Sequence, residues 1–125
     1  MLICPLVDAG RETIYSAFYR PRGKALAMEG DYYVGDIEGL AQKVKEPVLF
    51  LGKPAYLHRA VIADEVGALA SFGSPSDISS GCAVALLALS RFAAGTADDA
   101  LSLVPLYLGE SLAQALLRKK GLDVR

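Results

Sequence analysis

A chain of 125 residues with 53% hydrophobic and 22% charged residues has the composition of one globular domain, which excludes a disordered chain. Its net charge of -1 does not favour binding to a phosphate backbone, so we do not expect nucleic-acid binding by this chain alone. The two cysteines, Cys4 and Cys82, lie within apolar runs, and this predicts buried free thiols in place of a disulfide.

The sequence carries no visible signal for a membrane. Its N-terminus, MLICPLVDAG, lacks the basic region and cleavage site of a signal peptide. The longest apolar stretch, from Cys82, is interrupted at Ser90 and Arg91 before the roughly 20 residues that a bilayer span needs. We therefore expect a cytoplasmic protein without a membrane partner. Because a buried strand starts at Leu2, we expect residues 1–125 to be a single domain cut from a longer protein.

The first part of the chain predicts three antiparallel strands. Residues 2–7 are apolar on both strand faces, and residues 13–20 alternate and are rich in aromatic side chains, which predicts a β-hairpin over 2–20. Turn residues follow at 21–23. A third strand is expected over 24–35, interrupted near Gly30 by a bulge or turn.

The rest of the chain alternates predicted helices and strands. Asp36 can cap a helix that Pro47 ends, and the wholly apolar PVLFLG is typical of a buried parallel strand. The long helix through Ala94 is apolar nearly all round, so we expect it to be buried on more than one face. The other expected elements are a short helix over 55–65, a weak strand over 67–73, helix caps within 76–80, and a last helix that carries Leu112, Leu116 and Leu117.

This order of elements predicts an α/β fold. A three-stranded antiparallel meander is extended by parallel strands with flanking helices. It is the order of a ribonuclease-H-like domain, which forms one half of an actin-like ATPase. Such half-domains usually work in pairs with a nucleotide between them, and this chain carries one.

The turn of the predicted hairpin holds the candidates for a nucleotide site. Backbone N–H groups around Asp8 and Gly10 can in principle cradle a phosphate or a hydrated metal ion. Arg11 would attract phosphate, whereas the carboxylate of Glu12 would repel it. Since Asp and Gly are also common turn residues, we expect a structural turn and no bound cofactor.

The sequence does not show a catalytic constellation. His58 is the only histidine, which excludes a zinc peptidase with paired histidines within this chain. A Ser-His-Asp triad would combine His58 with Ser71, Ser79 or Ser80, but the G-x-S-x-G elbow is missing, and serines at a helix start fit capping. We expect His58 to be an exposed helix residue, and we expect no catalytic residues, no metal site and no enzyme activity.

Acidic pairs and tyrosines offer two further candidate clusters. Adjacent carboxylates do not face each other on a helix, so the pairs at 64–65 and 98–99 are expected to be solvated or to cap helices. Four tyrosines could form a stacking platform for bases, but few basic residues interleave them, and packing within the sheet is favoured. These tyrosines are Tyr15, Tyr19, Tyr32 and Tyr33.

Two stretches of the sequence resemble one protein family. PLVDAGRETIYSAFYR, residues 5–20, is similar to the strand, Asp-Ala, turn and strand, ending in Y-x-A-x-Y, that open the C-terminal domain of the TsaB (YeaZ) family. VPLYLGES, residues 104–111, resembles the near-terminal Pro-x-Tyr-Leu motif of that family. The sequence departs from the family at Gly10 and Gly109, where Arg is usual, and at residues 12–13, where Gly-Glu is usual.

The resemblance implies a bacterial, non-catalytic scaffold and dimerisation subunit that supports formation of N6-threonylcarbamoyladenosine next to the tRNA anticodon. The resemblance also implies that residues 1–125 form the C-terminal half of a longer protein. The implied partners of the full-length protein are a TsaD-like transferase and a TsaE-like ATPase, a homodimer is left open, and no strong direct tRNA binding by this chain is expected. The family is related in fold to the peptidase M22 glycoproteases. Two alternatives remain: half of an active actin-like ATPase or sugar kinase, and a free-standing glycoprotease-like structural domain.

Overall fold

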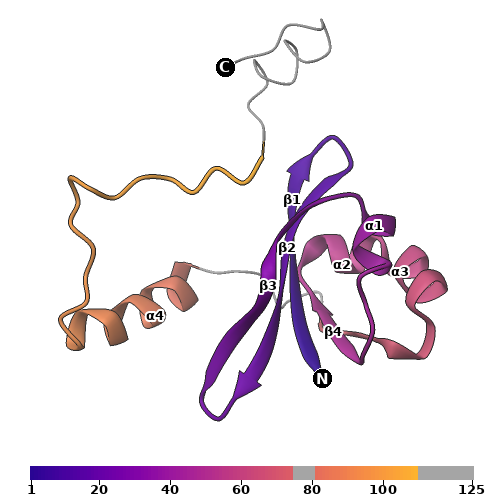
Figure 1. The fold of residues 1–125 in the computed structure, drawn as a ribbon, viewed down its shortest axis with the longest axis horizontal. Helices are drawn as coiled ribbons and strands as arrows, with labels where there is room; N and C mark the ends of the chain where they lie inside the picture. The colour runs from indigo at the N-terminus through magenta and orange to yellow at the C-terminus, as the bar shows by residue number, and fades with distance from the viewer. Residues whose placement is uncertain (75–80, 110–125) are drawn as a thin grey trace, which may run out of the picture.

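The computed structural model describes residues 1–74 and 81–109, and its centre is one mixed five-stranded sheet (Figure 1). The strand order is β3-β2-β1-β4-β5; the first three strands in the chain pair antiparallel, while β4 is parallel to both β1 and β5. The predicted α/β class and the predicted meander with its parallel extension are confirmed. The strands are β1 Leu2–Gly10, β2 Thr13–Arg22, β3 Ala25–Gly35, β4 Val48–Leu51 and β5 Ala70–Phe72.

The predicted interruption near Gly30 is a bulge within a continuous strand. Ser16 of β2 pairs with Tyr33, but Phe18, only two residues later, pairs with Glu29. The strand β3 therefore carries extra residues at this point, and Gly30 there has a φ of +75, which glycine adopts without strain.

Helix α1, Ile37–Ala41, begins where the sequence predicts. The carboxylate of Asp36 accepts a hydrogen bond of 2.8 Å from the N–H of Gly39 and so caps the first turn. The prediction that the helix continues to Pro47 is wrong. The N–H of Val44 bonds to the carbonyl of Ala41, three residues back, and such tight bonds close a helix and let the chain turn into β4.

The helix predicted over 55–65 is two helices, α2 Lys53–Leu57 and α3 Arg59–Val66, followed by a short 3-10 turn, η1 Gly67–Leu69. His58 separates them, because its backbone angles of φ -101 and ψ 18 leave the helical region. Its N–H still bonds to the carbonyl of Pro54, and its own carbonyl accepts from the N–H of Ile62. The break therefore changes the direction of the chain without leaving these backbone groups unpaired.

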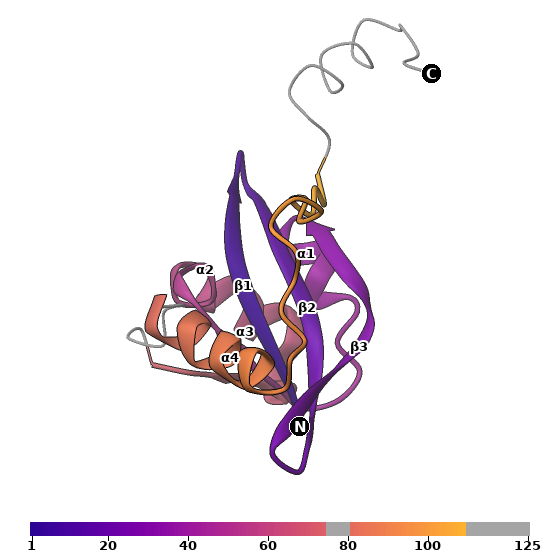
Figure 2. The ribbon, with the colours of Figure 1, turned by 90° about the vertical axis from the view of Figure 1, so that its left-hand side faces the viewer.

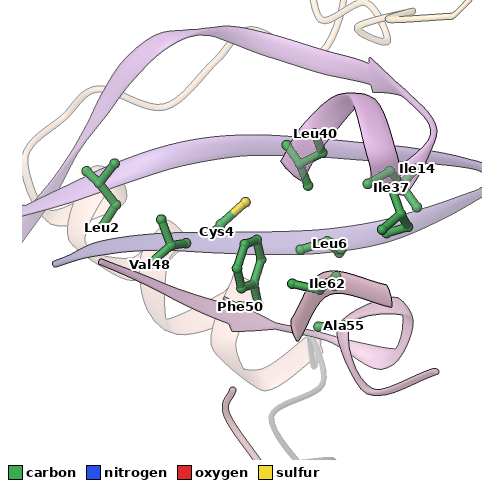
Figure 3. Close-up of a cluster of buried hydrophobic side chains, with 10 residues drawn as sticks. All are labelled: Leu2, Cys4, Leu6, Ile14, Ile37, Leu40, Val48, Phe50, Ala55 and Ile62. Atoms are coloured by element: carbon green, nitrogen blue, oxygen red, sulfur yellow. The ribbon is translucent and has the colours of Figure 1, made fainter. Parts of the chain in front are cut away.

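The hydrophobic core lies between one face of the sheet and the helices α1, α2 and α3 (Figure 3). Alternate residues of β1, β2 and β4 point into it, as the period of a strand requires. The cluster consists of Leu2, Cys4, Leu6, Ile14, Ile37, Leu40, Val48, Phe50, Ala55 and Ile62.

Helix α4, Gly81–Ala93, confirms the predicted helix but not its predicted burial. None of its side chains is buried, although Leu, Val, Ala and Phe make up most of it. It lies on the side of the sheet opposite α1–α3 (Figures 1 and 2). Cys82 is consequently exposed, whereas Cys4 is buried; both thiols are free. The expected last helix and the caps at 76–80 fall outside the described residues.

Candidate functional site at the hairpin tip

The tip of the β1–β2 hairpin is a two-residue turn in an unusual conformation. Gly10 and Thr13 are paired, and the residues between them, Arg11 and Glu12, have φ values of 54 and 62. Two consecutive left-handed residues make a turn of the I′ kind, which fits the twist of a hairpin and normally uses Asn and Gly. Both side chains are exposed, so the tip holds one positive and one negative charge in a costly backbone conformation.

The side chain of Asp8 stabilises this turn by a hydrogen bond to its backbone. Its Oδ1 atom accepts a hydrogen bond of 2.7 Å from the N–H of Gly10. This N–H is one of the donors that a phosphate-binding hairpin would offer to its ligand. The Asp8 carboxylate thus occupies the Gly10 N–H, and the negative charges of Asp8 and Glu12 both disfavour a phosphate at this turn. The two candidate residues are brought together, but their geometry is that of a self-contained turn.

His58 is exposed, as predicted, at the junction of α2 and α3. Its side chain makes no hydrogen bond to another described residue, and Ser71 lies on β5. Ser79 and Ser80 fall outside the described residues. Within residues 1–74 and 81–109, no group of three or more His, Cys, Asp or Glu side chains is placed to hold a metal ion.

The acidic pair at 98–99 stabilises local structure after α4. Asp98 receives two hydrogen bonds, of 2.9 and 3.1 Å, from the guanidinium of Arg91. Asp99 accepts from the N–H of Leu101 at 3.3 Å. The pair at 64–65 is exposed on α3. The solvated role predicted for the pair at 64–65 is therefore confirmed, whereas the ion pair of Asp98 with Arg91 was not predicted.

The four tyrosines do not form one stacking platform. Tyr15, Tyr19 and Tyr32 line a shallow hollow of about 150 Å³ on the sheet face that α1–α3 leave uncovered. Tyr33 lies on the other face, against the core, where its hydroxyl donates to the carbonyl of Asp36 at 3.0 Å. The predicted packing within the sheet is confirmed for Tyr33, whereas Tyr15, Tyr19 and Tyr32 lie together on the uncovered face, where Tyr32 is 46% exposed.

Leu108 also lines this hollow, together with Pro5 and Val7 of β1. The next residue, Gly109, is so close to the ring of Tyr15 that an added Cβ would lie 2.9 Å from its hydroxyl oxygen. The near-terminal segment therefore reaches back to the hairpin. Our reading of the sequence missed this contact, although the outward-facing apolar residues of the hairpin were a signal for it.

A second hollow, of about 430 Å³, lies beside the bulge of β3. Acidic Glu29 and Asp31 and basic Lys43 and Lys45 line it, so its charges are mixed and select no ligand. Next to it, Arg20 donates to the carboxylates of both Glu29 and Glu46 at 2.6 and 2.7 Å. These hydrogen bonds lower the pKa of both glutamates.

Comparison with known proteins assigns this chain to no family. No family model matches it, and no curated protein shows significant similarity to its sequence. Among the residues that the structure describes, no helix is long and apolar enough to cross a membrane.

Proposed function

We propose that this chain is the C-terminal half of a TsaB-like protein, a non-catalytic scaffold and dimerisation subunit in the bacterial cytoplasm. The complete protein would act with a TsaD-like transferase and a TsaE-like ATPase in forming N6-threonylcarbamoyladenosine next to the tRNA anticodon. In this proposal the domain is a ribonuclease-H-like half of an actin-like fold. It provides a surface for other subunits and no catalytic residues.

The hydrogen bond between Asp8 and Gly10 is the observation that carries this proposal. In an active actin-like half-domain the hairpin would keep its N–H groups free for phosphate. Here the Gly10 N–H is taken by the carboxylate of Asp8 at 2.7 Å. The exposed carboxylate of Glu12, in the same turn, would repel a phosphate that approached the hairpin. A hairpin with these features supports a structural role and disfavours the ATPase and sugar-kinase alternatives.

The sheet order and one contact add support. The order β3-β2-β1-β4-β5, antiparallel in its first three strands and parallel in the rest, agrees with a ribonuclease-H-like topology. The two segments that carry the TsaB resemblance come together at Leu108 and Gly109: Leu108 lines one hollow with Pro5 and Val7, and Gly109 lies beside the ring of Tyr15. Because fold alone does not determine function, the assignment to tRNA modification depends on these segments and needs a direct test.

The test is complementation of a bacterial strain that lacks its TsaB subunit. The product of the complete gene should restore the modified nucleoside, which mass spectrometry of digested tRNA detects. The variant Asp8→Ala of the complete protein should restore it equally, since the carboxylate only closes a turn. Unmodified adenosine despite a soluble complete protein and intact partners would refute the proposed function. Loss of modification in a folded Asp8→Ala variant would refute the scaffold role of this half.

A further inference from the structure

The sheet face turned away from α1–α3, which we name the outer face, is apolar and incompletely covered. Val7 of β1 is 55% exposed, and Val34 and Met28 of β3 are exposed as well. They lie on one face because Val7 and Val34 both pair with Tyr15, while Met28 pairs with Tyr19. The residues that line the hollow in this face carry no charged side chain. Such a continuous apolar surface usually marks a site of interaction.

The described part of the chain ends beside this face. Leu108 lines the hollow together with Val7, and a Cβ added to Gly109 would lie 2.9 Å from the hydroxyl oxygen of Tyr15. Helix α4 lies on the same side of the sheet (Figures 1 and 2), but none of its residues lines the hollow and none of its side chains is buried. The segment after Gly109, residues 110–125, therefore starts at the uncovered surface.

The sequence after Gly109 has the pattern of an amphipathic helix. Ser111 and Gln114 have the spacing of a capping box, which marks a helix start. Three basic residues at 118–120 and then Gly121 are typical of a helix end. Gln114 and Arg118 fall on one side of such a helix. The opposite side is apolar and carries Leu112, Ala113, Leu116 and Leu117, at helical spacing.

We propose that residues 112–120 form a helix that packs by its leucines on the outer face of the same chain, starting beside Tyr15. A helix of this length is about 14 Å long. The four residue steps of β2 from Tyr15 to Tyr19 span about 13 Å. The leucines can therefore cover the exposed apolar residues that pair with these two tyrosines. This inference does not depend on the proposed role in tRNA modification.

The small size of this contact favours a segment of the same chain as the occupant. A helix about 14 Å long and about 10 Å wide covers on the order of 150 Å² of the face. Stable complexes between separate proteins bury roughly 800 Å² on each partner. A separate partner would also lose its translational and rotational freedom on binding, whereas a segment held at Gly109 already has a high effective concentration.

Thiol labelling of Val7→Cys tests the contact, in a chain whose exposed Cys82 is replaced by serine. In the 125-residue chain the thiol at position 7 should react at least about tenfold more slowly than in a chain that ends at Gly109, because the docked helix must first detach. Leu57→Cys on α2 is the matched control. This leucine is 63% exposed in the other layer, and its replacement should react equally fast in both chains.

Two point variants repeat the test without shortening the chain. Leu116→Glu should speed labelling at position 7 about as much as the truncation, because docking would bury a carboxylate. Gln114→Glu places the same side chain on the opposite side of the predicted helix and should leave labelling slow. Both replacements keep a residue type that favours a helix. Circular dichroism checks that the sheet stays folded in every variant.

Protection at position 7 that is independent of protein concentration, and that only Leu116→Glu and the truncation remove, would support the proposal. Equal labelling of the long and short chains would overturn it, since the face would then be open or covered by α4. Protection that increases with protein concentration would assign the face to a second copy. Equal effects of Leu116→Glu and Gln114→Glu would show that the leucines make no contact with the sheet.

Discussion

The Sγ atom of Cys4 lies 3.0 Å from the Oγ atom of Ser16, and the two join β1 to β2 inside the hydrophobic core. Ser16 is the only buried polar residue among those that the structure describes. A buried hydroxyl without a partner is costly, so this contact explains how the core accommodates a serine.

Replacement of Ser16 by alanine should lower the free energy of unfolding by about 1 kcal/mol, the usual net contribution of one buried hydrogen bond. Urea denaturation measures the change. Ser71→Ala, at an exposed strand position, is the control and should change stability by less than about 0.5 kcal/mol. Equal effects of the two substitutions would show that the bond to Cys4 contributes nothing.

Burial raises the pKa of the Cys4 thiol to about 11, from 9.0 in an exposed site. The unfolded chain therefore loses this proton first, and the thiol's contribution to stability is lost as pH rises from 9 to 11. We expect stability to fall by up to about 1.4 kcal/mol per pH unit in this window. The difference between the unchanged protein and Cys4→Ala isolates the effect from the tyrosines. A difference that does not vary between pH 8 and 11 would contradict it.

Glu12 occupies a left-handed position with a φ of 62. Glycine adopts this conformation without the steric cost that a side chain pays, so Glu12→Gly should raise the free energy of unfolding by about 1 kcal/mol. The same replacement at Glu65, in the last turn of α3, should lower it, because glycine has a low helix propensity. Chemical denaturation of both variants measures the sign of each change in the free energy of unfolding. Destabilisation by Glu12→Gly would disprove the strain at this turn.

Arg20 holds the pKa of Glu29 and Glu46 below the ordinary value of 4.5 through hydrogen bonds to both carboxylates. Glutamates with a lowered pKa stabilise the folded protein above pH 4.5, and this contribution disappears as pH falls through their folded values. Arg20→Gln should therefore move acid unfolding, followed by circular dichroism, to higher pH. Arg22→Gln, whose guanidinium is 4.0 Å from Glu29 and more exposed, is the control and should shift it less.

The chain should not bind Mg-ATP with micromolar affinity, because Asp8 already occupies the Gly10 N–H and Glu12 repels phosphate. Isothermal titration calorimetry measures this directly. Micromolar binding that disappears in Asp8→Ala would favour the ATPase or sugar-kinase alternative and count against the scaffold.

Local patterns in the sequence were sufficient for most of the order of elements among the described residues, but not for the division of the helix expected over 55–65 into α2 and α3. Alternating apolar residues predicted the hairpin and the third strand, and Asp36 predicted the start of α1, because side-chain period and capping involve only neighbours in the chain. The turn residues Asp8 and Gly10 were likewise recognised as a structural turn. The left-handed backbone of the next two residues, Arg11 and Glu12, was not predicted, because these residue types have no intrinsic preference for that conformation.

Only the tertiary structure decided which surfaces are covered. The apolar composition of α4 predicted burial, yet whether a helix is buried depends on what packs against it, and that is not encoded in its own period. In the same way, Arg20 reaches Glu46 across 26 positions, and Gly109 lies beside the ring of Tyr15. Such contacts join residues far apart in the chain, and they form only once the sheet has fixed the register of its strands.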